Sequence, residues 1–240
     1  MRVGIVSDVH SNLPALTAVL TDMGPVDQLW CLGDIVGYGP YPNECIELLR
    51  QRNCVGIPGN HDWGCAGKIS LEDFNVEARW ACEWSRQAIS ADNLAFLESL
   101  PLTRTEGDFT LAHGTPHEPI WEYMAYPSTA RLNFHYFASR YCLVGHTHVP
   151  LVFRDVDMGP ETFHPGPGKP LALESTRAII NPGSVGQPRD GNPQAAYAVI
   201  DTEATEMAFH RVAYDVASIQ ARMRELGFPE RLIKRLAYGW

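Results

Sequence analysis

Leu29-Trp30-Cys31-Leu32-Gly33-Asp34-Ile35-Val36-Gly37 is the stretch from which the fold of this chain is most readily inferred. The apolar run over residues 29–32 predicts a buried strand, and Gly33 breaks it. Asp34 therefore follows directly on a buried strand, where a carboxylate without a partner is costly. A metal ion is a strong candidate for that partner, because a carboxylate offers two oxygens. We expect Asp34 to bridge two metal ions whose other ligands arrive from similar strand ends.

Parallel βαβ units surround this stretch. Arg2 to Ser7 and Cys54 to Ile57 are predicted strands, and the helices between them begin near Pro14 and cover Glu44 to Arg52. The alternation of strand and helix is typical of a parallel sheet in an α/β protein. In such sheets ligands gather outside the carboxyl ends of the strands.

The rest of the chain adds a helical cap and further strands. Predicted helices over 69–89 and 91–100 form a cap region at about 69–100 over one part of the sheet. The remaining predicted elements are strands at 109–112, 141–144, 151–153, 177–180, 195–200 and 207–212, helices at 128–139 and from about 216 and 230, and a loop or long hairpin over 155–170. No internal repeat or linker interrupts residues 1–240, so we expect a single domain.

Composition narrows the class of protein. The 240 residues are 45% hydrophobic and 20% charged, which is ordinary for a soluble globular protein. The formal net charge of -9 argues against a general nucleic-acid-binding surface, so no stable nucleic-acid complex is expected. No run approaches the roughly 18 apolar residues of a membrane span. The six cysteines are scattered without a CxxC pair, and no cleavage-site pattern follows Met1, so we expect reduced thiols in a cytoplasmic protein.

Polar side chains recur where predicted strands end. They are Asp8, His10, Asp34, Asn60, His61, His113, His146 and His148. Each alone is as readily a turn residue or a hydrogen-bonded structural side chain. Together they include five of the nine histidines. Imidazole suits zinc, iron, manganese or copper, while carboxylate and amide oxygens suit harder ions. The absence of clustered cysteines favours a catalytic metal centre over a structural zinc site.

The order of these motifs resembles the calcineurin-like metallophosphoesterase family, and in particular its small prokaryotic phosphodiesterases. The matching pieces, within about the first two thirds of the chain, are Asp8-Val9-His10, Gly33-Asp34, Gly59-Asn60-His61-Asp62, His113-Gly114 and Gly145-His146-Thr147-His148. The resemblance implies a four-layer α/β/β/α sandwich with a dinuclear metal centre on the loops at one end. It also implies hydrolysis of a phosphodiester through attack by a metal-bound hydroxide.

The resemblance assigns a role to each matching residue. It implies that Asp8, His10 and His148 hold one divalent metal ion. It implies that Asn60, His113 and His146 hold the other, with Asp34 shared between them. The ions would be manganese, iron, zinc or nickel. His61 would face the substrate phosphate and either stabilise charge or protonate the leaving oxygen, since a histidine of ordinary pKa can carry a proton there. Asp62 would orient that imidazole.

Other residues near the motifs have two readings each. Asn12 would touch phosphate or cap the following helix. Arg189 would bind a phosphate oxygen through its fork or form a surface salt bridge. The aromatic residues that would line a substrate pocket or simply pack in the core are Tyr38, Tyr41, Trp121, Tyr123 and Tyr126.

Several substrate and function classes stay open. Gly37-Tyr38-Gly39 stands where Ser/Thr protein phosphatases carry an acid and an arginine, so protein phosphatase is disfavoured. A small phosphorylated substrate is expected, such as a nucleotide or a dinucleoside polyphosphate. The rivals are a non-catalytic binding module of the same fold and a structural metal or redox protein. The complete ligand set weighs against the first rival, and the lack of clustered thiolates weighs against the second. No pattern indicates an oligomeric state.

Overall fold

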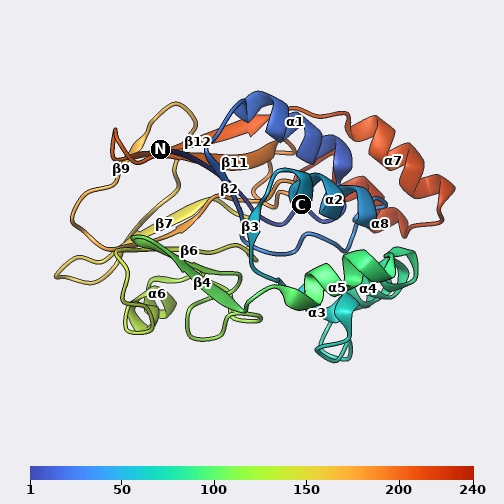
Figure 1. Ribbon diagram of the computed structural model, residues 1–240, viewed down its shortest axis with the longest axis horizontal. Coiled ribbons are helices and arrows are strands. Elements are labelled where there is room, and N and C mark those ends of the chain that lie inside the picture. The colour runs from blue at the N-terminus through green and yellow to red at the C-terminus, as the bar shows by residue number, and fades with distance from the viewer.

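The computed structural model describes residues 1–240 as two six-stranded sheets packed face to face, with helices on the outer faces (Figure 1). The first sheet has the order β3-β2-β1-β11-β12-β9, in which β3, β2 and β1 are parallel and the later strands antiparallel. Its strands are β1 (Arg2–Val6), β2 (Gln28–Cys31), β3 (Val55–Gly56), β9 (Leu171–Ala172), β11 (Ala195–Asp201) and β12 (Glu206–Val212).

The second sheet has the order β4-β5-β6-β10-β7-β8 and is also mixed. Strands β5, β6 and β10 are parallel, while β4, β7 and β8 pair antiparallel with their neighbours. Its strands are β4 (Thr103–Glu106), β5 (Phe109–Ala112), β6 (Tyr141–Leu143), β7 (Leu151–Arg154), β8 (Glu161–Phe163) and β10 (Ala178–Asn181).

Helices form the outer layers and flank one end of the sheets. They are α1 (Leu13–Met23), α2 (Pro42–Gln51), α3 (Asn60–Ala66), α4 (Val76–Ala88), α5 (Ala91–Ser99), α6 (Pro127–Asn133), α7 (Val216–Glu225) and α8 (Glu230–Arg235). Helices α1, α2, α7 and α8 share one apolar cluster with the first sheet, and α6 packs on the second. Helices α3, α4 and α5 pack together beside α2 (Figure 1).

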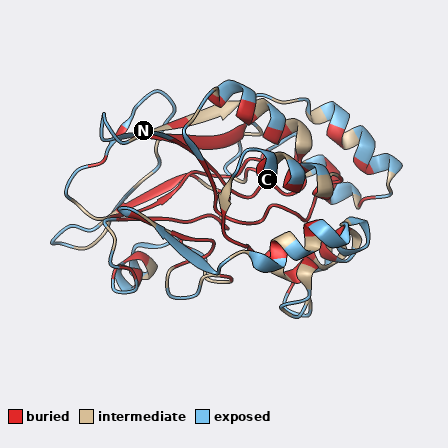
Figure 2. Ribbon diagram, viewed as in Figure 1, coloured by how far each residue is buried: buried red, intermediate tan, exposed pale blue.

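The core lies between the two sheets, where both inner faces are apolar (Figure 2). On β1, Val3 and Ile5 point to this core while Val6 faces the helices, as the alternation of side chains along a strand requires. Leu111 and Leu143 face the same core from the second sheet. The predicted α/β class and the four layers are confirmed, and the opening βαβ units are parallel as expected.

Some predicted boundaries were wrong for local reasons. The helix expected from Ile69 begins only at Val76, because the Asn75 side chain accepts a hydrogen bond from Ala78 N and caps it there. The helix expected over 128–139 ends at Asn133. Helix α3, which begins at Asn60, was not predicted. Strand β4 was not predicted, because its sequence Thr-Arg-Thr-Glu has no apolar alternation.

None of the helices combines the length and the apolar character that a bilayer crossing needs.

Candidate metal centre

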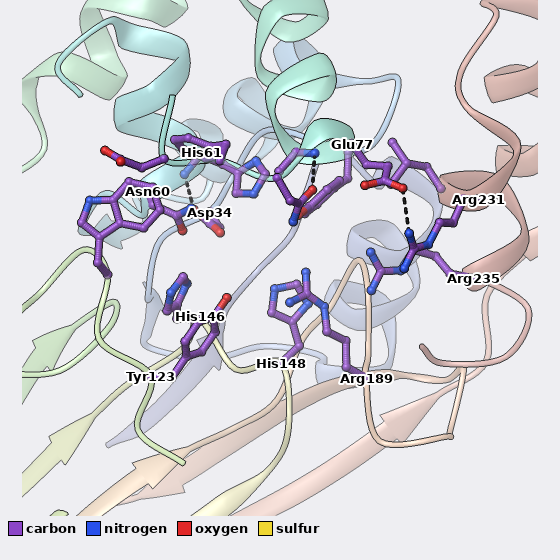
Figure 3. A pocket seen from close by; sticks show the side chains of 17 residues that line it. Asp34, Asn60, His61, Glu77, Tyr123, His146, His148, Arg189, Arg231 and Arg235 are labelled. Carbon is purple, nitrogen blue, oxygen red and sulfur yellow. Dashed lines mark hydrogen bonds and ion pairs between the residues drawn. The ribbon is translucent and has the colours of Figure 1, made fainter. Parts of the chain in front are cut away.

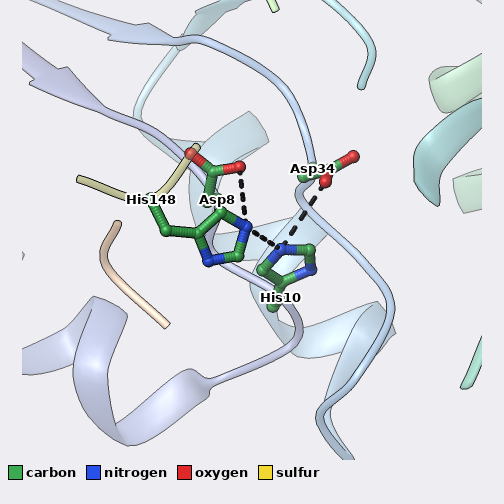
Figure 4. Close-up of side chains that lie close together, drawn as sticks. All are labelled: Asp8, His10, Asp34 and His148. Carbon is green, nitrogen blue, oxygen red and sulfur yellow. Dashed lines mark hydrogen bonds and ion pairs between the residues drawn. The ribbon is translucent and has the colours of Figure 1, made fainter. Parts of the chain in front are cut away.

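Polar side chains at strand ends of both sheets meet in one buried cluster (Figure 4). The first sheet contributes Asp8 and His10 after β1, Asp34 after β2, and Asn60 after β3; the second contributes His113 after β5, and His146 and His148 after β6. All seven have relative exposures of 4% or less. The two sheets must therefore pack together before this cluster exists.

Main-chain carbonyls fix the tautomers of the buried imidazoles. The Nδ1 atoms of His10, His113 and His148 lie 3.0, 2.8 and 2.6 Å from the carbonyl oxygens of Val36, Leu32 and Gln187. A carbonyl oxygen only accepts, so each Nδ1 carries a proton, and Nε2 of His10 and His148 presents a lone pair because burial keeps these two rings neutral. Histidines that bind metals are usually oriented in this way.

These lone pairs face one another and the carboxylates. His10 Nε2 lies 3.2 Å from His148 Nε2, and His148 Nε2 lies 3.4 Å from Asp8 Oδ1. Asp34 Oδ2 lies 3.5 Å from His10 Nε2 and 3.4 Å from His113 Nε2. Donor atoms therefore converge in two groups that share Asp34: Asp8, His10, Asp34 and His148, and Asp34, His113 and His146.

Most of the buried histidines in the cluster are neutral, so they do not balance the negative charge of the carboxylates. Burial lowers the pKa of His10 and His148 well below the ordinary value and that of His146 to about 3. Burial opposes ionisation of Asp34 as well, but the nearby imidazoles, His113 first, hold the pKa of its carboxyl well below its usual range. His113 is the exception among the ligand candidates, because Asp34 overcomes burial and raises its pKa to about 9. A cation between the groups would satisfy lone pairs that protons do not.

The backbone at the cluster is strained. Five of its residues have φ between +49° and +63°, a range that residues other than glycine rarely adopt: Asp8, His10, Asp34, His146 and His148. Strain of this kind persists only where the surrounding structure enforces it, and it concentrates at functional sites. Here it turns successive polar side chains inward at the strand ends.

Asn60 completes the chemical fit to a metal pair. Its Oδ1 atom is buried and has no hydrogen-bond partner, and neither has Nε2 of His146. An orphaned amide oxygen is costly in the folded protein, and it is a natural ligand for a divalent cation. Two buried groups of His and Asp donors are thus consistent with a dinuclear metal site, with Asn60 beside the second group.

A cavity of about 420 Å³ opens over the cluster (Figure 3). It is lined by Asp34, Tyr38, Asn60, His61, Asp73, Phe74, Asn75, Glu77, Ala78, Trp121, Tyr123, His146, His148, Arg189, Arg231, Leu232 and Arg235. Of the aromatic residues proposed for a substrate wall, Tyr38, Trp121 and Tyr123 line it, whereas Tyr41 and Tyr126 do not. Tyr123 stacks on His146 with ring centroids 4.1 Å apart.

Sequence reasoning missed the charged side chains that α4 and α8 bring to this cavity. They are Glu77, Arg231 and Arg235, together with Asp73 just before α4. No motif marks them, because they reach the cavity only through the packing of distant helices.

Asn12 does not face the cavity, so the expectation that it touches phosphate is corrected. Its Oδ1 accepts from Ala15 N at 3.1 Å, and its Nδ2 donates to Gly186 O at 2.9 Å. The side chain is 1% exposed. Both polar atoms are used, and Asn12 is the cap of α1, which was the other reading of this residue.

Asp62 does not orient His61, which corrects that expectation. Its two carboxylate oxygens accept from Val36 N at 3.0 Å and from Gly59 N at 2.9 Å, because the first turn of α3 points the side chain back at these amides. Asp62 thus ties the Asp34 loop to the Asn60 loop. The atom beside His61 Nδ1 is Cys82 Sγ, at 3.3 Å.

Arg189 lines the cavity and makes no ion pair with a carboxylate side chain, so the surface salt-bridge reading does not hold. Its Nη2 donates to Gln187 Oε1 at 2.8 Å, and its main-chain N donates to the carbonyl oxygen of the ligand candidate His148. The guanidinium therefore remains available to an anion in the cavity.

Comparison with known proteins places this geometry among phosphoesterases. A family model for the calcineurin-like phosphoesterase superfamily domain matches residues 1–205. The crystal structure of a metallophosphoesterase from Sphaerobacter thermophilus is similar, with a TM-score of 0.92 and 51% identity over 100% of this chain and 99% of that one. An uncharacterized protein of Methanocaldococcus jannaschii is 41% identical over 99% of this chain and 98% of its own. Phosphodiesterase YfcE of Escherichia coli is 24% identical over 85% of this chain and 89% of its own.

Replacing the shared carboxylate tests whether the two donor groups depend on each other. We expect Asp34→Ala to lose divalent metal from both groups, since Asp34 Oδ2 faces a histidine of each. The measurement is metal content per chain by mass spectrometry after loading and desalting. Asp92→Ala, at a carboxylate whose side chain is 88% exposed, is the matched control. An Asp34→Ala protein with the full metal content of the parent refutes the bridge.

The close approach of the Gly59 backbone to Asp34 gives a second test. A Cβ at Gly59 would lie 2.0 Å from Asp34 Oδ1, whereas one at Gly56 would meet nothing closer than Leu100 Cδ2 at 3.6 Å. We expect Gly59→Ala to cost about 2 kcal/mol of unfolding free energy and to weaken metal binding. Gly56→Ala should change stability by less than about 1 kcal/mol. Equal denaturation midpoints for the two variants would contradict this packing.

Proposed function

The chain belongs to the calcineurin-like phosphoesterase superfamily and is a metallophosphoesterase, a hydrolase of phosphoester bonds; from this premise we propose that it cleaves a phosphodiester. The observation that carries the proposal is the pair of buried donor groups that share Asp34 beneath the cavity. The name of its relative in Escherichia coli, a phosphodiesterase, supports the diester.

In this proposal each donor group holds one divalent ion of manganese, iron, zinc or nickel. Asp8, His10 and His148 are the ligands of one ion, Asn60, His113 and His146 are the ligands of the other, and Asp34 binds both. A bound metal pair supplies positive charge to phosphate oxygens and a water whose pKa lies near 7 instead of about 15.7. The chain itself keeps the donor atoms buried and in a fixed orientation.

His61 is the residue proposed to assist the leaving group. Its main-chain N donates to Asp34 Oδ1 at 2.8 Å, which sets the imidazole beside the shared carboxylate. Burial lowers the pKa of His61 to about 4, so the ring is neutral at pH 7 and the expectation of a histidine with ordinary pKa is revised.

Cys82 contacts that neutral ring, with its Sγ 3.3 Å from His61 Nδ1. A hydrogen bond with Cys65 and burial raise the pKa of the Cys82 thiol, which therefore keeps its proton. Nε2 of His61 has no hydrogen-bond partner within the protein. In the tautomer with hydrogen on Nε2, this atom would donate a hydrogen bond to the leaving oxygen.

The cavity has room for groups on both sides of the scissile phosphate, as a diester requires. Tyr123 offers aromatic surface stacked on His146, Trp121 lines the same cavity against Phe74, and Arg189 offers a guanidinium beside His148 (Figure 3). An aromatic wall suits a nucleobase or another flat organic group. A nucleotide-like phosphodiester is therefore the substrate class that the cavity favours.

Hydrolysis of chromogenic esters tests the proposed activity. Protein stripped of metal and reloaded with Mn, Ni, Zn or Mg in turn should hydrolyse bis(4-nitrophenyl) phosphate with a higher kcat/KM than 4-nitrophenyl phosphate. Release of 4-nitrophenol at 405 nm is the measurement. No hydrolysis with any metal would favour the binding module instead, and a preference for the monoester would overturn the diester assignment.

A substitution at His61 tests whether this residue acts in catalysis or in metal binding. We expect His61→Ala to keep the metal content of the parent and to lower kcat about a hundredfold or more, since the donor to the leaving oxygen is removed. His135→Ala, at an exposed histidine, should leave kcat unchanged. A metal-free His61→Ala protein would instead make this residue a ligand or a structural support.

A further inference from the structure

We propose that the arginine end of the cavity is a second anion subsite, and that the substrate carries a second phosphate group which Arg189 and Arg235 bind. The inference rests on the proposed function, because it places the scissile phosphate at the metal centre. It goes beyond that function, since a simple phosphodiester has no second anionic group.

The subsite is built largely by the C-terminal part of the chain. Arg231 and Arg235 lie on α8, beyond the residues 1–205 that the family model matches. Figure 3 shows Arg231 and Arg235 reaching the cavity from the right and Arg189 rising from below, beside His148. The chain has a formal net charge of -9, so a concentration of guanidinium groups here is not a general property of its surface.

The guanidinium groups of Arg189 and Arg235 form no ion pair with a carboxylate side chain. The charge of Glu77 opposes the lowering of the Arg235 pKa, and Arg235 uses only Nε, in a hydrogen bond to the Trp240 main-chain oxygen. Both Nη atoms of Arg235 and Nη1 of Arg189 are without partners in the protein. Arg231 differs, because its Nη1 donates to Glu77 at 3.0 Å and its side chain is 83% exposed.

Both of these cations lie against Tyr38. The guanidinium carbons of Arg189 and Arg235 are 5.8 and 5.9 Å from the centroid of the same Tyr38 ring. Burial and the charge of Arg189 lower the pKa of Arg235 to about 10, so Arg235 stays charged at neutral pH and the two guanidinium groups repel each other. A bound dianion would relieve that repulsion, and two guanidinium forks match phosphate oxygens.

Tyr38 connects this subsite to the metal centre. The Tyr38 ring centroid lies 4.4 Å from that of His61 and 4.7 Å from that of His10, so Tyr38 is a common neighbour of the cluster and the arginines. No side-chain hydrogen bond or ion pair joins either guanidinium to a ligand candidate. The arginines therefore line the same cavity as the metal centre and would meet a second phosphate on the same small molecule.

Binding and turnover of a matched ligand pair test the subsite. Thymidine 3′,5′-bisphosphate and thymidine 5′-monophosphate differ only in the second phosphate, and their affinities for metal-loaded protein are measured by calorimetry. The parent should bind the bisphosphate more tightly, and Arg235→Gln should reduce that advantage about tenfold. Arg235→Lys should restore part of it. Lys234→Gln, at an exposed cation on the same helix that does not line the cavity, should match the parent.

The 4-nitrophenyl 5′-esters of thymidine monophosphate and of its 3′-phosphorylated form give the kinetic readout. The kcat/KM for the 3′-phosphorylated ester, divided by that for the ester without the 3′-phosphate, should be lower in Arg235→Gln than in the parent, in step with the ratio of affinities. Equal losses for both ligands would mean that Arg235 serves the scissile phosphate, and no bisphosphate advantage in the parent would exclude the subsite; either overturns the inference. Failure of the parent to cleave the ester without the 3′-phosphate would overturn the proposed function instead. Arg189→Gln repeats the test if Arg235→Gln does not fold.

Discussion

This structure depends on one constraint: nitrogen lone pairs of buried imidazoles are held close to one another. Carbonyl oxygens bind the Nδ1 protons of His10, His113 and His148, and the imidazoles cannot turn away without losing those hydrogen bonds. Nε2 atoms 3.2 Å apart, next to buried carboxylates, repel unless a cation lies among them. The strained backbone at these residues adds to the cost. The protein therefore stores unfavourable energy that a metal pair would release.

The architecture explains how the chain sustains this cost. The two sheets bury a large apolar core between them, and their strand ends meet at one edge of the sandwich. Asp34 comes from the first sheet and His113 from the second, and their contact requires both sheets in register. Asp62 adds a local tie, because its carboxylate joins the loops after β2 and β3. Packing energy from the whole domain thus holds a few polar side chains in place.

Residues that follow strands directly were predictable from the sequence, whereas residues that depend on long-range packing were not. Asp8 and Asp34 follow apolar runs, and parallel strands deliver their carboxyl ends to the same edge, so their meeting could be expected. Asp62 was misjudged because the amide of Val36, in another loop, competes for its carboxylate. Arg235 carries no local signal, since its place in the cavity depends on how α8 packs against the first sheet.

Asp34 should bind two cations at once. Anomalous diffraction from crystals soaked with manganese, recorded at the manganese edge, tests this bridge. We expect two anomalous peaks roughly 3.5–4 Å apart with Asp34 Oδ2 within bonding distance of both. A single peak, or peaks that leave Asp34 uncoordinated, would contradict it.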